Sequence, residues 1–150
     1  MDALVHGHSG LRWLVLALLV FAIVNAIIKR KSGKYEKSDK MLNLFAMVIV
    51  HIQITLGIIL TFVSGKVNYG NNWMKAKNIN EVAEFRFFGM EHIILMVLAA
   101  VLLTIGRKKA EKSLDVAKKH KTILIWYTIG LLIILAGIPW PFRGFTTGWF

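Results

Sequence analysis

Four long apolar runs, separated by polar segments, dominate the chain. They cover residues 9–28, 41–63, 87–106 and 122–138, each close to the ~20 residues that cross the hydrocarbon core of a bilayer. Backbone groups inside lipid have no water to bond, so these runs must be helical. The pattern predicts an all-α fold: one integral membrane domain of four helices over residues 1–150. Asn80 followed by Glu81 is a helix-start signal, which predicts that the third helix extends outward beyond its apolar run.

Basic residues are concentrated in two short linkers. Linkers 29–40 and 107–121 carry thirteen of the nineteen Lys and Arg residues, and the opposite side carries five. By the positive-inside rule the linkers are cytoplasmic. We therefore expect an up-down bundle in a bacterial cytoplasmic (inner) membrane, with both termini and the 64–86 loop on the outer, periplasmic side. Four tryptophans fall near the expected outer interface: Trp13, Trp73, Trp140 and Trp149.

Composition narrows the function further. A net charge of +11 could suit nucleic-acid binding, but topology already explains where the charge lies, so no nucleic-acid partner is expected. The absence of cysteine excludes covalent haem attachment, iron–sulfur clusters and disulfides. A signal peptide begins with basic residues and ends in a cleavage site of small residues. The first apolar run has neither feature, so we interpret it as a retained helix.

Ionisable side chains inside the spans mark the candidate site, because they are costly in lipid and usually face the bundle interior. They are Arg12, His51, Glu91 and His92, with His8 at the mouth of the first helix. A rise of about 1.5 Å per residue places His51 and His92 within roughly 6 Å of the same depth on adjacent helices. This pair is the predicted metal-binding site, since facing helices can point imidazoles at a common metal.

A b-type haem in the outer half of the bundle would use these residues. Ala99 and Gly106 below His92 would leave room for a flat ligand, and Arg12 above it would bind a carboxylate. Two histidine ligands leave iron no open position, so the predicted chemistry is one-electron transfer. His8 is an alternative ligand.

Four motifs carry a resemblance to a known group of proteins. They are HSGLRW at 8–13, HIQ at 51–53, EH at 91–92 and GIPWPFR at 137–143. With them the chain resembles small bacterial four-helix membrane proteins labelled cytochrome b-like, and its architecture is similar to that of quinone-linked cytochromes b. The chain lacks the four intramembrane histidines of the diheme type. The resemblance therefore implies at most one haem b, a possible quinone, and a link to the quinone pool.

Each of these polar residues also has a purely structural interpretation. His51 could hydrogen-bond across helices, and His92 could meet water near the headgroups. Arg12 could extend outward to the headgroups instead of binding an anion. Glu91 is expected to pair with Arg12 or to be protonated, and it is the candidate catalytic residue for proton exchange at a quinol site.

Two further residues are expected to lie away from the site. Gln53 points about 160° away from His51 on the same helix, so it could face a partner subunit. His120 lies among lysines in a linker and is expected to be solvated.

The leading functional hypothesis is an electron-transfer subunit that binds one haem in the outer half of the bundle, rather than a stand-alone enzyme. Its expected partners are the lipid bilayer and either a larger membrane complex or further copies of the chain. The alternative is a cofactor-free accessory subunit of a larger membrane complex. On that alternative, the polar side chains within the spans make only protein contacts.

Overall fold

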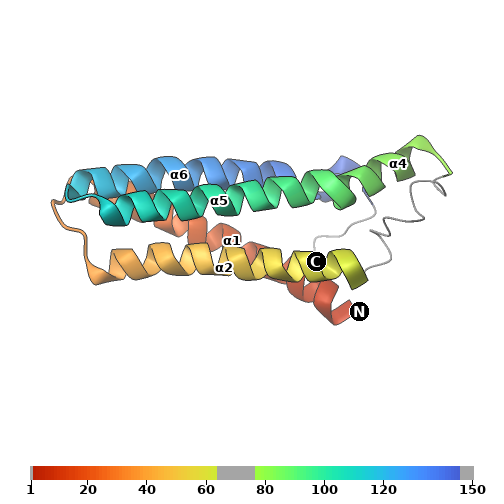
Figure 1. The fold of residues 1–150 in the computed structure, drawn as a ribbon, viewed down its shortest axis with the longest axis horizontal. Helices are drawn as coiled ribbons and strands as arrows, with labels where there is room; N and C mark the ends of the chain where they lie inside the picture. Colours follow the sequence, from red (N-terminus) through yellow and green to blue (C-terminus); the bar gives the residue numbers. More distant parts are fainter. Residues whose placement is uncertain (1, 64–76, 146–150) are drawn as a thin grey trace.

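The part of the chain that the structure describes forms four long helical segments that lie side by side (Figure 1). The computed structural model describes residues 2–63 and 77–145, and all regular structure within these ranges is helical. The elements are α1 (Asp2–Lys29), α2 (Lys37–Val63), α4 (Ile79–Arg86), the π-helical turn η2 (Phe87–Glu91), α5 (His92–Lys112), α6 (Val116–Gly137) and the 3-10 turn η3 (Pro141–Arg143). Counting α4, η2 and α5 as one segment, four helices are long and apolar enough to cross a membrane, which confirms that prediction. Trp73 and Trp149 lie outside the described residues.

The helices extend beyond the apolar runs that predicted them. α1 begins at Asp2 rather than near Ser9, and α2 begins at Lys37 rather than at Met41. A helix tolerates charged residues where it leaves the hydrocarbon, so hydropathy marks the lipid-embedded part and not the helix ends. As a consequence, His8 lies within α1 and not at its mouth.

The third span extends outward, as predicted, but Asn78 caps it instead of Asn80. Asn78 Oδ1 accepts a hydrogen bond from the Glu81 backbone nitrogen at 3.0 Å, and Asn78 Nδ2 donates to Glu81 Oε1 at 3.2 Å. The first bond satisfies a backbone N–H that a helix start leaves open, and the second joins the two side chains. Further along, the π-helical turn η2 interrupts the α-helical register between α4 and α5.

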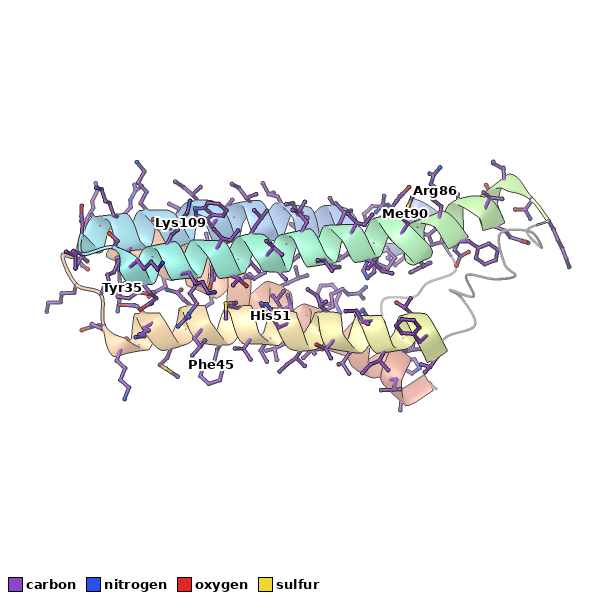
Figure 2. All side chains as sticks on the ribbon, viewed as in Figure 1. Tyr35, Phe45, His51, Arg86, Met90 and Lys109 are labelled. Atoms are coloured by element: carbon purple, nitrogen blue, oxygen red, sulfur yellow. The ribbon has the colours of Figure 1, made fainter. Side chains whose placement is uncertain are left out.

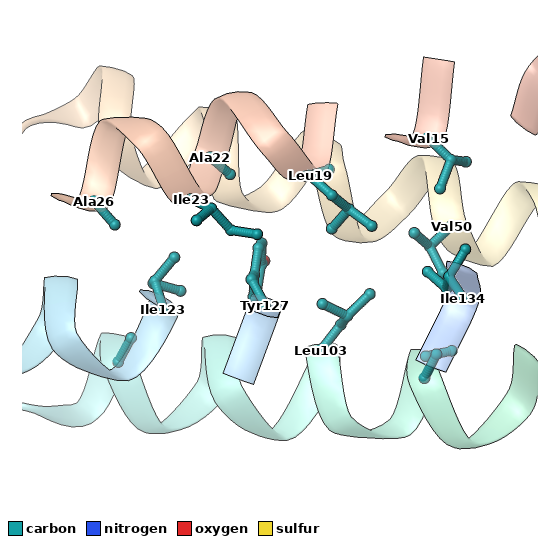
Figure 3. Packing of buried hydrophobic residues seen from close by; sticks show 14 of the residues in the cluster. Val15, Leu19, Ala22, Ile23, Ala26, Val50, Leu103, Ile123, Tyr127 and Ile134 are labelled. Atoms are coloured by element: carbon teal, nitrogen blue, oxygen red, sulfur yellow. The ribbon is translucent and has the colours of Figure 1, made fainter. Parts of the chain in front are cut away.

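The core is a narrow stripe of small and branched side chains between the helices (Figure 3). Leu19 and Ala22 of α1 are fully buried, as are Leu103 of α5 and Ile123 of α6. Tyr127, also fully buried, donates from its hydroxyl to the Asn43 carbonyl at 2.6 Å. Many large apolar side chains elsewhere point outward, and such a surface suits contact with lipid.

Close packing of α5 against α6 depends on glycine. A Cβ atom at Gly106 would collide with the Trp126 side chain, and one at Gly130 would lie 2.9 Å from Leu103. Ala99 is also fully buried. The expectation that Ala99 and Gly106 leave room for a flat ligand is therefore wrong, because side chains of α6 fill the space beside Gly106.

Both short linkers lie at one end of the bundle, the linker end (Figure 1). Tyr35 donates to Glu111 Oε1 at 2.8 Å, and His120 Nε2 donates to the Lys34 carbonyl at 2.9 Å. His120 is only 1% exposed, so the prediction that it is solvated is wrong. Burial raises the pKa of Tyr35 above its usual range, which keeps its hydroxyl protonated as a donor.

A second polar cluster joins α1 to α2 at the same end. Asp39 is buried and accepts from Asn25 Nδ2 at 2.8 Å and from the Glu36 backbone nitrogen at 2.8 Å. Lys29 Nζ lies 2.9 Å from the same carboxylate. This buried carboxylate falls within α2 but before residue 41, where the apolar run begins, so the hydropathy pattern did not place it inside a helix.

Candidate functional site

His8 of α1 and His92 of α5 lie close together at the end of the bundle opposite the linkers. Their ring centres are 6.3 Å apart and the ring planes are inclined by 78°. The rings of Phe87 and Phe88 lie beside His92, with centres 5.8 and 6.4 Å from it. The structure thus pairs His92 with His8, the alternative ligand of the sequence analysis. These two side chains are the imidazole pair.

His92 is oriented by a carbonyl of the fourth span. Its Nδ1 lies 2.7 Å from the Gly137 carbonyl oxygen. A carbonyl can only accept, so Nδ1 carries a hydrogen, and the neutral ring then has its lone pair on Nε2. Metal-bound histidines usually have this arrangement, with one ring nitrogen donating to a fixed acceptor and the other available to the metal.

His8 is held from the second span. Gln53 Nε2 donates to the His8 carbonyl at 2.8 Å and lies 3.4 Å from His8 Nε2. Gly57, one turn further along α2, lets the ring approach, because a Cβ there would be 3.1 Å from His8 Cε1. His8 Nδ1 is buried and has no hydrogen-bond partner within the described part of the chain. Such a nitrogen is rare in a folded protein and is suited to completion by a ligand.

The Gln53 contact corrects an expectation. The sequence allows Gln53 to face a partner subunit, but the side chain contacts α1 of its own chain. Gln53 and His51 are two residues apart on α2, and such residues point to nearly opposite sides of a helix. His51 accordingly contacts α5 while Gln53 contacts α1.

Arg12 and Glu91 have different surroundings. Arg12 is only 8% exposed, with its guanidinium carbon 5.4 Å from the centre of the Trp13 ring, so its side chain is packed against protein. Glu91 Oε1 lies 2.7 Å from Arg86 Nε, and the Glu91 side chain is 38% exposed. The expected pairing of Glu91 with Arg12 is therefore replaced by a surface ion pair with the preceding turn.

His51 lies outside the imidazole pair. Its Nε2 is 3.3 Å from Thr104 Oγ1, and Thr104 lies more than three turns, roughly 18 Å, along α5 from His92. One metal does not bridge side chains so far apart, so the structure does not bring His51 and His92 together within one chain. The expected difference in depth between His51 and His92 is too small, partly because it takes residues 41 and 106 as the helix ends. The helices continue to Lys37 and Lys112.

The imidazole pair suits a particular kind of metal group. Imidazole nitrogens bind metals at about 2.0–2.1 Å, so two rings that share one metal have centres roughly 6 Å apart. The 6.3 Å between the ring centres of His8 and His92 is close to this value. Among the described residues, no group of three or more His, Cys, Asp or Glu side chains could hold a bare metal ion.

Comparison with known proteins adds no assignment, since no family model, curated protein or solved structure matches the chain. Gln53, Gly57 and Gly137 complete the site but were not predicted as part of it. Gln53 and Gly57 could have been recognised in the sequence, because residues four apart share one face of a helix. A small residue on the same face as an amide lets another helix approach closely. No comparable signal marks the Gly137 carbonyl, since any residue there would supply one.

Proposed function

We propose that the chain is a multi-pass protein of a bacterial cytoplasmic membrane that transfers electrons through one b-type haem, held in the outer half of the bundle by His8 and His92. In this proposal the four helices form an up-down bundle, and the linker end is cytoplasmic. The observation that carries the proposal is the imidazole pair: its ring centres are 6.3 Å apart, His92 Nδ1 donates to the Gly137 carbonyl, and His8 Nδ1 has no hydrogen-bond partner among the described residues.

The residues around the pair have separate roles. The Gly137 carbonyl orients the His92 imidazole. The Gln53 side-chain amide binds the His8 backbone carbonyl and lies 3.4 Å from His8 Nε2. Arg12 supplies a buried cation for an acidic group of the bound cofactor. A haem held by His8 and His92 would supply one-electron transfer. Because the pair lies near one end of the bundle, an electron donor in the quinone pool or a partner subunit must complete the path.

The test is a reduced-minus-oxidised absorption spectrum of purified protein that has been supplied with haem. We expect a b-type α-band that is lost in His8→Ala and in His92→Ala, because each replacement removes one iron ligand. His51→Ala is the matched control and should keep the band. Size-exclusion profiles check that each variant remains folded.

Two outcomes would contradict this assignment. Wild-type protein without an α-band would remove haem from the proposal. A band that survives both His8→Ala and His92→Ala but disappears in His51→Ala would place the haem elsewhere.

A cofactor-free accessory subunit remains the second candidate, and one observation favours it. His92 and His8 both have protein contacts, to Gly137 and Gln53. On this alternative the histidine replacements leave the spectrum unchanged, and the chain copurifies with larger membrane subunits.

A further inference from the structure

The carboxyl end of α6 lies beside the imidazole pair, at the end of the bundle opposite the linkers. Figure 2 shows Arg86 and Met90 at this end and Tyr35 at the linker end. α6 ends at Gly137 because Ile138 precedes a proline and has extended backbone, with φ −71° and ψ 133°. A helix end leaves its last four carbonyls without partners inside the helix. The donors that reach these carbonyls decide how the end of α6 is held.

Two prolines remove backbone donors from the end of α6. In a continuing helix, the nitrogen of residue 139 would donate to the Leu135 carbonyl and that of residue 141 to the Gly137 carbonyl. Both positions are proline, which has no N–H. The nitrogen between them, that of Trp140, donates instead to the Ile138 carbonyl at 2.9 Å. The Ala136 carbonyl therefore loses its helical donor as well.

Side chains supply the three missing donors. In chain order, the first carbonyl accepts from Trp140 Nε1 at 2.9 Å and the second from Arg143 Nη1 at 2.8 Å. The third, that of Gly137, accepts from His92 Nδ1 at 2.7 Å. His92 is thus one of three side chains that cap α6, and the other two belong to the segment that follows the helix.

Aromatic rings hold Arg143 in this position. Its guanidinium carbon lies 4.8 Å from the centre of the Phe87 ring and 5.7 Å from that of Phe145. The two rings stack with their centres 4.6 Å apart, and Phe87 also lies beside His92. A guanidinium is attracted to the face of an aromatic ring. Arg143 therefore contacts the third span through Phe87 while it donates to the end of the fourth.

α5 holds the end of α6 from another side. Gly137 has no side chain, and a Cβ there would collide with the Met96 side chain and lie 3.2 Å from Leu95 Cβ. The end of α6 is therefore packed directly against α5 and capped by the segment that follows it. A carbonyl fixes the hydrogen and the direction of an imidazole only if the carbonyl is itself fixed.

We propose that Arg143 and Trp140 are positioning residues of the imidazole pair: by capping α6 they hold the Gly137 carbonyl at His92 Nδ1 and so keep the hydrogen on that nitrogen. The two prolines contribute by denying the same carbonyl a backbone donor. This assigns a physical role to the GIPWPFR motif at 137–143. The orientation of His92 does not require a haem, whereas its importance for haem binding rests on the function proposed above.

The test is nitrogen NMR of the full chain with isotope-labelled histidine, without haem, in lipid nanodiscs at alkaline pH, where free imidazole is neutral. The His92 resonances are assigned by comparison with His92→Ala, and they report how the hydrogen is distributed between Nδ1 and Nε2. We expect it on Nδ1 in the wild type. Arg143→Met should lower the ratio of the Nδ1–H form to the Nε2–H form about tenfold, the change that corresponds to one hydrogen bond. Arg143 is exposed, so the variant should remain folded.

Three further variants separate the hydrogen bonds from general loosening. Arg143→Lys keeps a cationic donor and should restore most of the wild-type ratio. Pro139→Ala combined with Pro141→Ala returns both backbone donors, so α6 should lengthen, occupy the Gly137 carbonyl and lower the ratio about tenfold. Arg86→Met is the matched control, because it removes an arginine at the same end that pairs with Glu91 and not with α6; it should leave the ratio unchanged.

The proposal is overturned if Arg143→Met and the double proline variant both keep the wild-type ratio. It is equally overturned if Arg86→Met lowers the ratio as much as Arg143→Met does, or if Arg143→Lys behaves like Arg143→Met. These measurements are made without haem, so a chain that lacks the α-band can still satisfy them. If the proposed function holds, Arg143→Met should also weaken haem binding about tenfold.

Discussion

At the scale of single residues, the polar groups inside the bundle are positioned mainly by backbone carbonyls. Tyr127 donates to the carbonyl of Asn43, His92 to that of Gly137 and His51 to that of Met47. A backbone carbonyl orients the donor whatever side chain its own residue carries. For this reason the partners of these residues could not be predicted from residue types, although the polar residues themselves could.

Tyr127→Phe tests the strength of one such bond. The substitution removes only the hydroxyl of a fully buried ring, and the Asn43 carbonyl retains its place in the α2 helix. We expect the free energy of unfolding to fall by about 0.5–1.5 kcal/mol. Tyr127→Ala also removes the ring and should cost about 3–5 kcal/mol, because it leaves a cavity between α1, α2 and α6.

Reversible unfolding in mixed detergent micelles measures both values. Equal losses in the two variants would show that the hydroxyl, and not the packing of the ring, dominates the contribution of Tyr127.

At the scale of helices, the number and type of the elements follow from the apolar runs, whereas their ends and their rotations do not. Lys37 and Asp39 lie in α2 although hydropathy starts that span at Met41, since helix and hydrocarbon need not end together. His8 and Gln53 meet because of how α1 and α2 are rotated against each other. Rotation is set by packing between helices, which a single sequence does not contain.

Gly106→Ala tests the close approach of α5 to α6. Because the added Cβ would collide with Trp126, we expect the helices to separate locally, with a loss of about 1–3 kcal/mol in the free energy of unfolding. Gly10→Ala on α1 is the matched control, since nothing lies within 4 Å of the added Cβ. It should be neutral or should stabilise the protein by up to about 1 kcal/mol, as alanine favours the helix.

The same unfolding assay applies to both glycine variants. If Gly106→Ala were as stable as Gly10→Ala, Trp126 would have to move without cost, and the α5–α6 contact would be looser than the structure indicates.

At the scale of the whole molecule, the distribution of charge accounts for the proposed orientation. Both linkers lie at one end of the bundle, and that end carries most of the Lys and Arg residues. Part of the charge is also structural, as in the contacts of Lys29 with Asp39 and Glu36. The proposed orientation, with the linker end in the cytoplasm, rests on the positive-inside rule. The side of the membrane that each end faces can be measured directly.

Single-cysteine labelling of intact cells provides it. The chain has no native cysteine, so each introduced thiol is unique. We expect a membrane-impermeant maleimide to label His6→Cys and Lys77→Cys from outside, because both positions are exposed at the end opposite the linkers. Ser32→Cys, in the first linker, should be labelled only after the membrane is permeabilised.

The wild-type chain should remain unlabelled in either case. The reverse pattern, with Ser32→Cys labelled in intact cells, would invert the proposed topology and place the imidazole pair on the cytoplasmic side.

The imidazole pair also has a consequence for how the protein is made. His8 belongs to the first span and His92 to the third, and the carbonyl that orients His92 comes from the end of the fourth. A chain emerging from the ribosome holds no complete site until all four spans have been inserted and have associated. A cofactor bound there must enter after synthesis, so cells that lack the cofactor should accumulate a fully inserted apoprotein rather than a truncated or degraded chain.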